Sequence, residues 1–238
     1  MTTSTTIMLP TDDGPMPTFR AVPDGPEKGG VVVVQEAFGV TTHIEDVARR
    51  FADAGWRSIA PSLFHRQGSP VIAYDDVGSV MPVMSQLTPQ GLAVDLGAAV
   101  DELGAAGHVP RRVAVVGFCM GGTVTFYAGT LQPLGAAVSF YGGGVTEGRF
   151  GLPSLVDLAP SLQTPWLGLY GDRDTGIPVE QVERLRAATD HVAVDTAVVR
   201  YPEGQHGFHC DDRPAVFDAA AASDAWTRTL DWLSGHIL

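Results

Sequence analysis

Apolar runs alternate with amphipathic stretches along most of this chain, and that alternation predicts a mostly parallel sheet with helices on both faces. The continuous run at Val31–Val34, followed by Gln35 and Glu36, is typical of a strand buried on both sides. Apolar residues at helical spacing predict amphipathic helices at 43–55 and 90–106. The other predicted elements are an edge strand at 18–22, strands at 57–61, 113–117, 136–141, 166–170 and 196–201, and helices directly after Cys119 and at 179–189 and 214–235.

The segment 62–88 shows no regular period and leaves open whether it covers a site as a lid. No internal repeat, low-complexity tract or linker divides the chain. We therefore expect one α/β domain over residues 1–238, and 238 residues with 45% hydrophobic content suffice for a sizeable core.

Composition limits the function classes. A net charge of −12 argues against nucleic acid and anionic lipid surfaces as partners. The sequence contains no run of 18 apolar residues, and its first ten residues do not resemble a signal peptide, so we expect a cytoplasmic protein that does not span a membrane. Two cysteines without a spacing pattern predict neither a disulfide framework nor a cysteine-based zinc site.

The segment Gly117-Phe-Cys-Met-Gly121 links a predicted strand to a predicted helix. It has the G-x-nucleophile-x-G pattern of the α/β-hydrolase elbow, with Cys119 where serine is usual. Small residues are needed two before and two after the nucleophile, because strand and helix approach closely there. The helix N-terminus favours a thiolate at Cys119. The alternative is that Cys119 is an inert buried cysteine.

An acid and a histidine follow in the chain order that this fold requires. Asp174 lies in the turn after the strand 166–170, and Asp172 is its competitor in the same turn. His206 follows the strand 196–201, and its rivals are His209 and His191. His206 would accept the thiol proton or hold the thiolate as an ion pair, while Asp174 would orient the imidazole.

An oxyanion hole would complete such a site. The backbone N–H of Met120 is one expected donor, and the second is expected from the turn after the strand at Val31–Gln35. Glu36 is unusual there, because an acid at the end of an apolar strand is costly unless it is paired. It is either a capping or surface acid or a carboxylate that tunes the thiol.

From about residue 14 onward, the chain resembles the dienelactone hydrolase family of α/β-hydrolases. The likeness rests on motifs in a fixed order: Gln35–Val40, Ile59–Pro61 with Leu63–Phe64, Gly117–Gly122, Phe140–Gly143, Gly171–Asp174 and His206–Phe208. The resemblance implies a monomeric enzyme without cofactor or metal that opens a lactone. It also implies Cys119 as nucleophile, His206 as base, Asp174 as orienting acid, Glu36 as activator of the thiol, and Ala37 and Met120 as the oxyanion donors.

The sequence departs from the family where substrate is recognised. Lactone-cleaving members hold a substrate carboxylate with arginines, yet residues 67–110 contain no Lys or Arg, and Cys210 occupies the position of a second expected arginine. Arg66 and Arg213 are the nearest replacements in sequence. The residues expected to bind substrate are Phe38, Arg66, Tyr74, Met84 and Tyr141.

Three functions follow from these patterns. The first is a cysteine hydrolase of a small ester or lactone, acting through an acyl-thioenzyme, and an uncharged or bulkier substrate fits the departures best. The second is a general carboxylesterase or thioesterase on the same triad. The third is a non-catalytic redox sensor that uses Cys119, with a disulfide to Cys210 as one route.

Overall fold

One mixed sheet of eight strands organises the protein in the computed structural model, which describes residues 2–237. The strand order is β1-β2-β4-β3-β5-β6-β7-β8, and all neighbours from β4 to β8 are parallel. The strands are β1 (Thr3–Thr11), β2 (Gly14–Val22), β3 (Gly30–Val34), β4 (Arg57–Pro61), β5 (Val113–Phe118), β6 (Ala136–Phe140), β7 (Trp166–Gly171) and β8 (Thr196–Tyr201).

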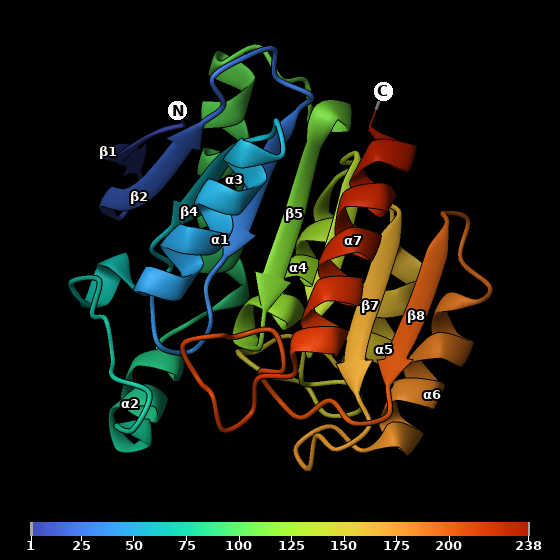
Figure 1. Ribbon diagram of the computed structural model, residues 1–238. Helices are drawn as coiled ribbons and strands as arrows, with labels where there is room; N and C mark the ends of the chain where they lie inside the picture. The colour runs from blue at the N-terminus through green and yellow to red at the C-terminus, as the bar shows by residue number, and fades with distance from the viewer. Residues whose placement is uncertain (1, 238) are drawn as a thin grey trace.

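Helices cover both faces of this sheet, as the alternating pattern predicts. They are α1 (Thr42–Asp53), α2 (Val80–Met84), α3 (Pro89–Ala105), α4 (Met120–Leu131), α5 (Leu155–Leu158), α6 (Val179–Thr189) and α7 (Ala219–His236). Figure 1 shows α1 and α7 in front of the sheet, with α3 and α4 behind it. Strands β3, β5 and β6 are buried throughout, so the two apolar layers of the core meet the sheet at its centre.

The sheet extends further than the hydrophobic pattern predicts. Strand β2 was expected at the edge, but it pairs with β4 on one side and with β1 on the other, both antiparallel. Strand β1 was not predicted, because most of its residues are exposed and its threonine-rich sequence lacks an alternating apolar face.

Two further details differ from expectation, the start of the final helix and the content of the segment 62–88. The final helix begins at Ala219 rather than near 214, since the Asp218 side chain accepts hydrogen bonds from the backbone N–H groups of Ala220 and Ala221. The irregular segment 62–88 contains the short helix α2.

The carboxyl ends of the parallel strands meet at one end of the sheet, where open α/β sheets form their active sites. In Figure 1 the arrows of the parallel strands point to this lower end, and α2 and the long loops before α5 and α7 gather there. No helix within residues 2–237 is long and apolar enough to cross a membrane.

Candidate active site

Cys119 occupies a strained turn between β5 and α4. Its backbone has φ 56° and ψ −117°, a region that non-glycine residues rarely adopt. The close approach behind the turn explains the flanking glycines: a Cβ at Gly117 would lie 2.1 Å from the Gly121 carbonyl oxygen, and one at Gly121 would lie 2.4 Å from that of Val34. The glycines therefore let strand and helix meet while the turn presents the Cys119 thiol.

His206 and Asp174 form a tight pair beside this turn. His206 Nδ1 lies 2.6 Å from Asp174 Oδ2, and the other oxygen of Asp174 accepts the backbone N–H of Gly176 at 2.8 Å. The Asp174 side chain is 2% exposed, so the carboxylate is held by its hydrogen bonds rather than by water. Asp172, the competing acid, instead binds Arg200 through two hydrogen bonds of 2.7 and 2.8 Å.

The electrostatics of His206 favour an imidazolium. Burial opposes the charge, but the electrostatic and hydrogen-bond interactions of the ring with Cys119 and with the Asp174 carboxylate outweigh it and raise the pKa of His206 to about 10. The aromatic ring of Tyr141 packs 5.1 Å from the imidazole, centroid to centroid. The three side chains therefore have the arrangement of a nucleophile, a base and an orienting acid.

Two backbone N–H groups can serve as oxyanion donors. Met120 is the first residue of α4, so its N–H has no acceptor within the helix. The N–H of Ala37 donates no hydrogen bond to any residue within 2–237. Met120 and Ala37 lie within three residues of the carboxyl ends of the neighbouring strands β5 and β3, at the end of the sheet that carries Cys119.

Glu36 is fully buried beneath the site. Tyr141 donates a long hydrogen bond of 3.5 Å to its Oε1, whereas Oε2 has no partner within the described residues. Burial, and after it the Glu36 charge, raises the pKa of both Tyr141 and Tyr74. No hydrogen bond joins Glu36 to the Cys119 thiol within the described chain, so the Glu36 carboxylate acts on this region through its charge.

A cavity of about 250 Å³ opens directly above Cys119. Its lining residues are Met84, Cys119, Met120, Gly143, Arg149, Asp174, Thr175, Gly176, Ile177 and His206. The nucleophile candidate, the pair of Asp174 and His206, and the first oxyanion donor thus share one cavity.

Of the five residues expected to bind substrate, Met84 is the one that lines this cavity. Tyr141 is fully buried below it. Phe38 and Tyr74 pack edge to face at 4.8 Å, with the Arg213 guanidinium over both rings, at a place that does not line the cavity.

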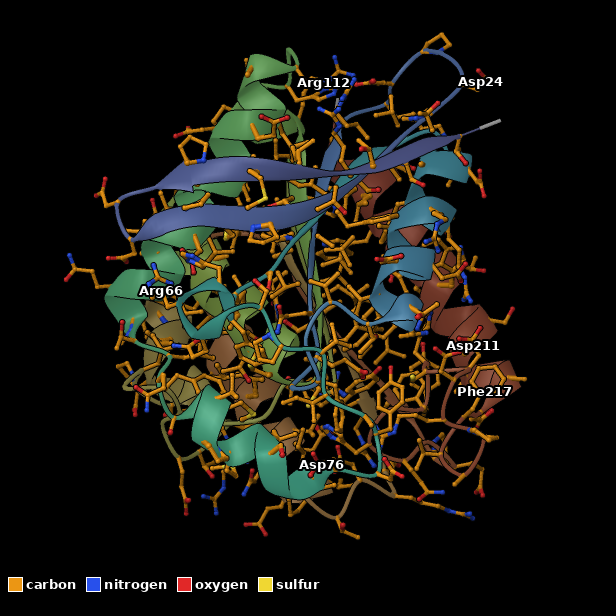
Figure 2. All side chains as sticks on the ribbon, turned by 90° about the vertical axis from the view of Figure 1, so that its left-hand side faces the viewer. Asp24, Arg66, Asp76, Arg112, Asp211 and Phe217 are labelled. Carbon is orange, nitrogen blue, oxygen red and sulfur yellow. The ribbon has the colours of Figure 1, made fainter. Side chains whose placement is uncertain are left out.

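Arg66 requires a correction. Its guanidinium binds the buried carboxylate of Asp95 at 2.8 and 3.0 Å and also pairs with Asp13. Figure 2 shows Arg66 on the flank of the molecule below the hairpin of β1 and β2. Nearness in sequence to the site was therefore misleading, because the chain turns toward α3 at this point.

The cation that lines the cavity is Arg149, which the sequence analysis did not consider. Within the described residues it forms no ion pair. A signal for it exists in the sequence: Arg149 is the single basic residue between Arg112 and Arg173, in the loop that follows a predicted central strand.

The remaining rivals lie elsewhere. His209 is buried against Phe118 and Phe140, and burial, followed by the charges of His43 and Arg50, lowers the pKa of His209 to about 3. His191 is exposed near the start of β8.

Cys210 donates a hydrogen bond to the Tyr74 hydroxyl at 3.4 Å. Burial, and next the Glu36 charge, raise the pKa of Cys210 to about 12, and both cysteines are free thiols. A thiol with so high a pKa is a poor partner for thiol oxidation, which disfavours the redox-sensor hypothesis.

Within residues 2–237 no group of three or more His, Cys, Asp or Glu side chains is arranged to hold a metal ion.

The strand order, the strained turn after β5 and the helices on both faces define an α/β-hydrolase fold. Residues 16–237 match the model of the "Dienelactone hydrolase family". The chain therefore belongs to this family and is a hydrolase of ester or lactone bonds, as the sequence predicted.

Known relatives agree with this assignment. Proteins named "Putative carboxymethylenebutenolidase" from Yersinia pestis and Methylorubrum extorquens are each 38% identical, over 96% and 95% of this chain and 86% and 79% of their own. A crystal structure named "Putative Dienelactone Hydrolase" from Klebsiella pneumoniae superposes with a TM-score of 0.90 at 36% identity, covering 98% of this chain and 99% of that one.

Proposed function

We propose that this protein is a cysteine-dependent hydrolase that cleaves a small ester or lactone through an acyl-thioenzyme. The observation that carries the proposal is the 2.6 Å contact between His206 and Asp174 in the cavity that also exposes Cys119 on a strained turn. Cys119 is the nucleophile, His206 the acid and base, and Asp174 the orienting carboxylate. Ala37 and Met120 supply the oxyanion N–H groups.

The first half-reaction uses the imidazolium and thiolate pair. The thiolate sulfur of Cys119 bonds to the carbonyl carbon, and the carbonyl electron pair moves to oxygen, where the two N–H groups stabilise it. Collapse of this intermediate breaks the bond to the leaving oxygen, which takes the Nε2 proton of His206. A thioester on Cys119 and a neutral imidazole remain.

Water completes the reaction. Neutral His206 removes a proton from water as the oxygen attacks the thioester carbon, and the second intermediate expels the Cys119 thiolate. The carboxylic acid leaves, and the thiolate again pairs with imidazolium. Asp174 stabilises the charged ring in both half-reactions, because its carboxylate accepts the hydrogen bond from Nδ1–H throughout.

Glu36 and the pocket side chains have supporting roles in this proposal. Burial, and after it the Glu36 charge, opposes ionisation of Tyr141, Tyr74 and Cys210, so Cys119, paired with His206, is the group that supplies the anionic nucleophile. Met84 contacts the substrate directly, and Tyr141 holds the His206 ring in place by packing.

The names of the relatives suggest the substrate. Carboxymethylenebutenolidase opens an unsaturated lactone, so dienelactone is the first compound to test. An uncharged or bulkier ester is the second candidate, because Arg66 is engaged by Asp95 and Cys210 occupies the place of a second arginine, which leaves Arg149 as the cation lining the cavity.

The proposal extends to the setting in which the enzyme works. A catalytic thiol and two free cysteines suit a reducing cytoplasm. All catalytic groups come from one chain, so we propose that the enzyme acts as a monomer, which light scattering of the purified protein would test.

The test compares wild type, Cys119→Ala and Cys210→Ala against dienelactone and short p-nitrophenyl esters. Turnover of either substrate by wild type and by Cys210→Ala, but not by Cys119→Ala, is the expected result. Ester turnover without dienelactone turnover places the substrate outside the lactones. Equal activity of wild type and Cys119→Ala would refute the proposal.

A further inference from the structure

A second cavity adjoins the catalytic one. It has a volume of about 420 Å³. Its lining residues are Met81, Met84, Ser85, Leu87, Arg149, Phe150 and Gly151. Met84 and Arg149 also line the cavity above Cys119, so the two spaces meet at these two side chains. Together they form one elongated site, whose outer half lies between α2 and the loop before α5.

Apolar side chains form most of the wall of the outer cavity, and Ser85 and Arg149 are its polar residues. Met84 and Leu87 are nearly buried and form its base, whereas Met81 is 62% exposed at its rim. Methionine side chains adapt their shape to a ligand at little cost, which suits a wall that receives flexible chains. Arg149 is exposed, and its guanidinium lies beside Gly143 of the catalytic cavity, so the junction between the two cavities carries the one charged side chain of the outer lining.

Backbone conformation fixes the opposite wall. Phe150 has φ 57° and Gly151 φ 73°, two consecutive left-handed residues, and the N–H of Leu152 donates to the Arg149 carbonyl at 2.8 Å across the turn. A phenylalanine pays about 1–2 kcal/mol for this conformation. The turn holds the Phe150 ring against the apolar layer that contains Met84 and Leu87.

The position of His206 determines which part of a substrate enters the outer cavity. The leaving group must lie beside His206, which protonates it. The outer cavity shares Met84 and Arg149 with the catalytic cavity, but neither His206 nor residues 174–177. A substrate with its carbonyl at Cys119 therefore directs its acyl part toward the outer cavity.

We propose that the outer cavity is an acyl subsite and that the enzyme prefers esters or thioesters with an unbranched apolar acyl chain of intermediate length over acetyl esters. This inference rests on the proposed function and specifies the substrate class of the same site. Each methylene group that is fully buried raises kcat/KM about fourfold. Because the cavity is partly open, we expect p-nitrophenyl octanoate to exceed p-nitrophenyl acetate in kcat/KM by at least about tenfold.

The test uses a matched pair of variants. Met81 and Val77 are exposed to a similar degree, 62% and 63%, in the same segment, but Met81 lines the cavity and Val77 does not. Met81→Asp should remove most of the octanoate preference and leave acetate turnover within about threefold, since it adds a charge to an apolar wall. Val77→Asp should leave both substrates unchanged. Ser85→Trp, which fills the cavity, should give the same loss as Met81→Asp.

The acyl subsite is refuted if the wild-type kcat/KM does not rise with the length of the acyl chain. It is refuted if Met81→Asp and Ser85→Trp lose acetate and octanoate turnover equally. It is also refuted if kcat/KM rises instead with the length of the alcohol part, as measured with a series of alkyl acetates. Cys119→Ala separates this proposal from the previous one. Acetate turnover that persists in Cys119→Ala refutes the catalytic mechanism, whereas Cys119-dependent turnover with no length preference refutes only the subsite.

Discussion

Replacing Asp174 by asparagine tests the catalytic pair, and Asp172→Asn is its natural control. Both acids lie in the turn after β7, and each accepts hydrogen bonds from a basic side chain, His206 or Arg200. The two acids differ in the location of the basic partner. His206 lines the cavity with Cys119, whereas the guanidinium of Arg200 binds Asp172 and Glu183.

The magnitude follows from the contact of 2.6 Å at a carboxylate that is 2% exposed. A hydrogen bond to a charged group contributes about 1.5–3 kcal/mol, and 3 kcal/mol corresponds to a factor of about 150 in rate. An asparagine amide facing Nδ1 also favours the wrong imidazole tautomer, which has cost about 10⁴ in a serine enzyme. We therefore expect kcat/KM of Asp174→Asn to fall by about 10² to 10⁴.

The assay has two readouts. Ester hydrolysis gives kcat/KM, and the rate of Cys119 alkylation by iodoacetamide against pH, followed by peptide mass spectrometry, gives the fraction of thiolate. In wild type the imidazolium deprotonates at about pH 10, so the basic limb of the kcat/KM profile should lie there. In Asp174→Asn that limb should move to lower pH, because one of the two groups that raise the pKa of His206 has lost its charge, while the interaction with Cys119 remains.

The reasoning is refuted if Asp174→Asn stays within about threefold of wild type, or if a folded Asp172→Asn loses as much activity. It is also refuted if the wild-type profile has an acid limb near pH 6.5 and no limb near 10, which would indicate a neutral imidazole acting as general base.

Three further predictions concern stability. His209→Phe should flatten the loss of stability at acid pH, because burial lowers the pKa of His209 to about 3 and only the unfolded chain takes up a proton on this histidine as the pH falls from 6.5 toward 3. Urea unfolding at pH 4.5 should differ by about 2–3 kcal/mol between variant and wild type, and an unchanged pH slope would contradict the prediction. Arg66→Ala should lower the free energy of unfolding by about 1–3 kcal/mol and leave ester turnover within twofold, because its partner carboxylate is buried away from the cavity; a loss of turnover would restore Arg66 to the site. Gly121→Ala should lower the stability of the fold by about 1–3 kcal/mol or more and abolish turnover, since the added Cβ meets two carbonyl oxygens. Its control is Gly97→Ala in α3, where the added Cβ enters open space and should raise the stability by about 0.5–1 kcal/mol in the same thermal melts.

The central strands of the fold were predictable because their apolar sequences fit only one structural environment. The run at Val31–Val34 can be buried on both faces only in the middle of a sheet, and it forms β3 there. Strand β1 was not predicted, because this exposed threonine-rich segment shows no alternation of apolar and polar residues. Its backbone hydrogen bonds are made to the free edge of β2.

The catalytic candidates were predictable for a different reason. Each lies within five residues of the carboxyl end of a parallel strand, so the sheet brings Cys119, Asp174 and His206 to one end. The walls of the cavity depend on loops that have no period in the sequence. Arg66 and Arg149 illustrate this: the first lies near the site in sequence but turns to Asp95, and the second lies far along the chain but lines the cavity.

The most direct test of the central proposal is to trap the acyl group on the enzyme. Wild type and Cys210→Ala are mixed with a slowly hydrolysed ester, quenched in acid within one turnover, and digested for mass spectrometry. The proposal predicts one acyl group per chain, on the peptide that contains Cys119, and no adduct in Cys119→Ala. Turnover with no adduct, or an acyl group on another residue, would contradict the assignment of Cys119 as the nucleophile.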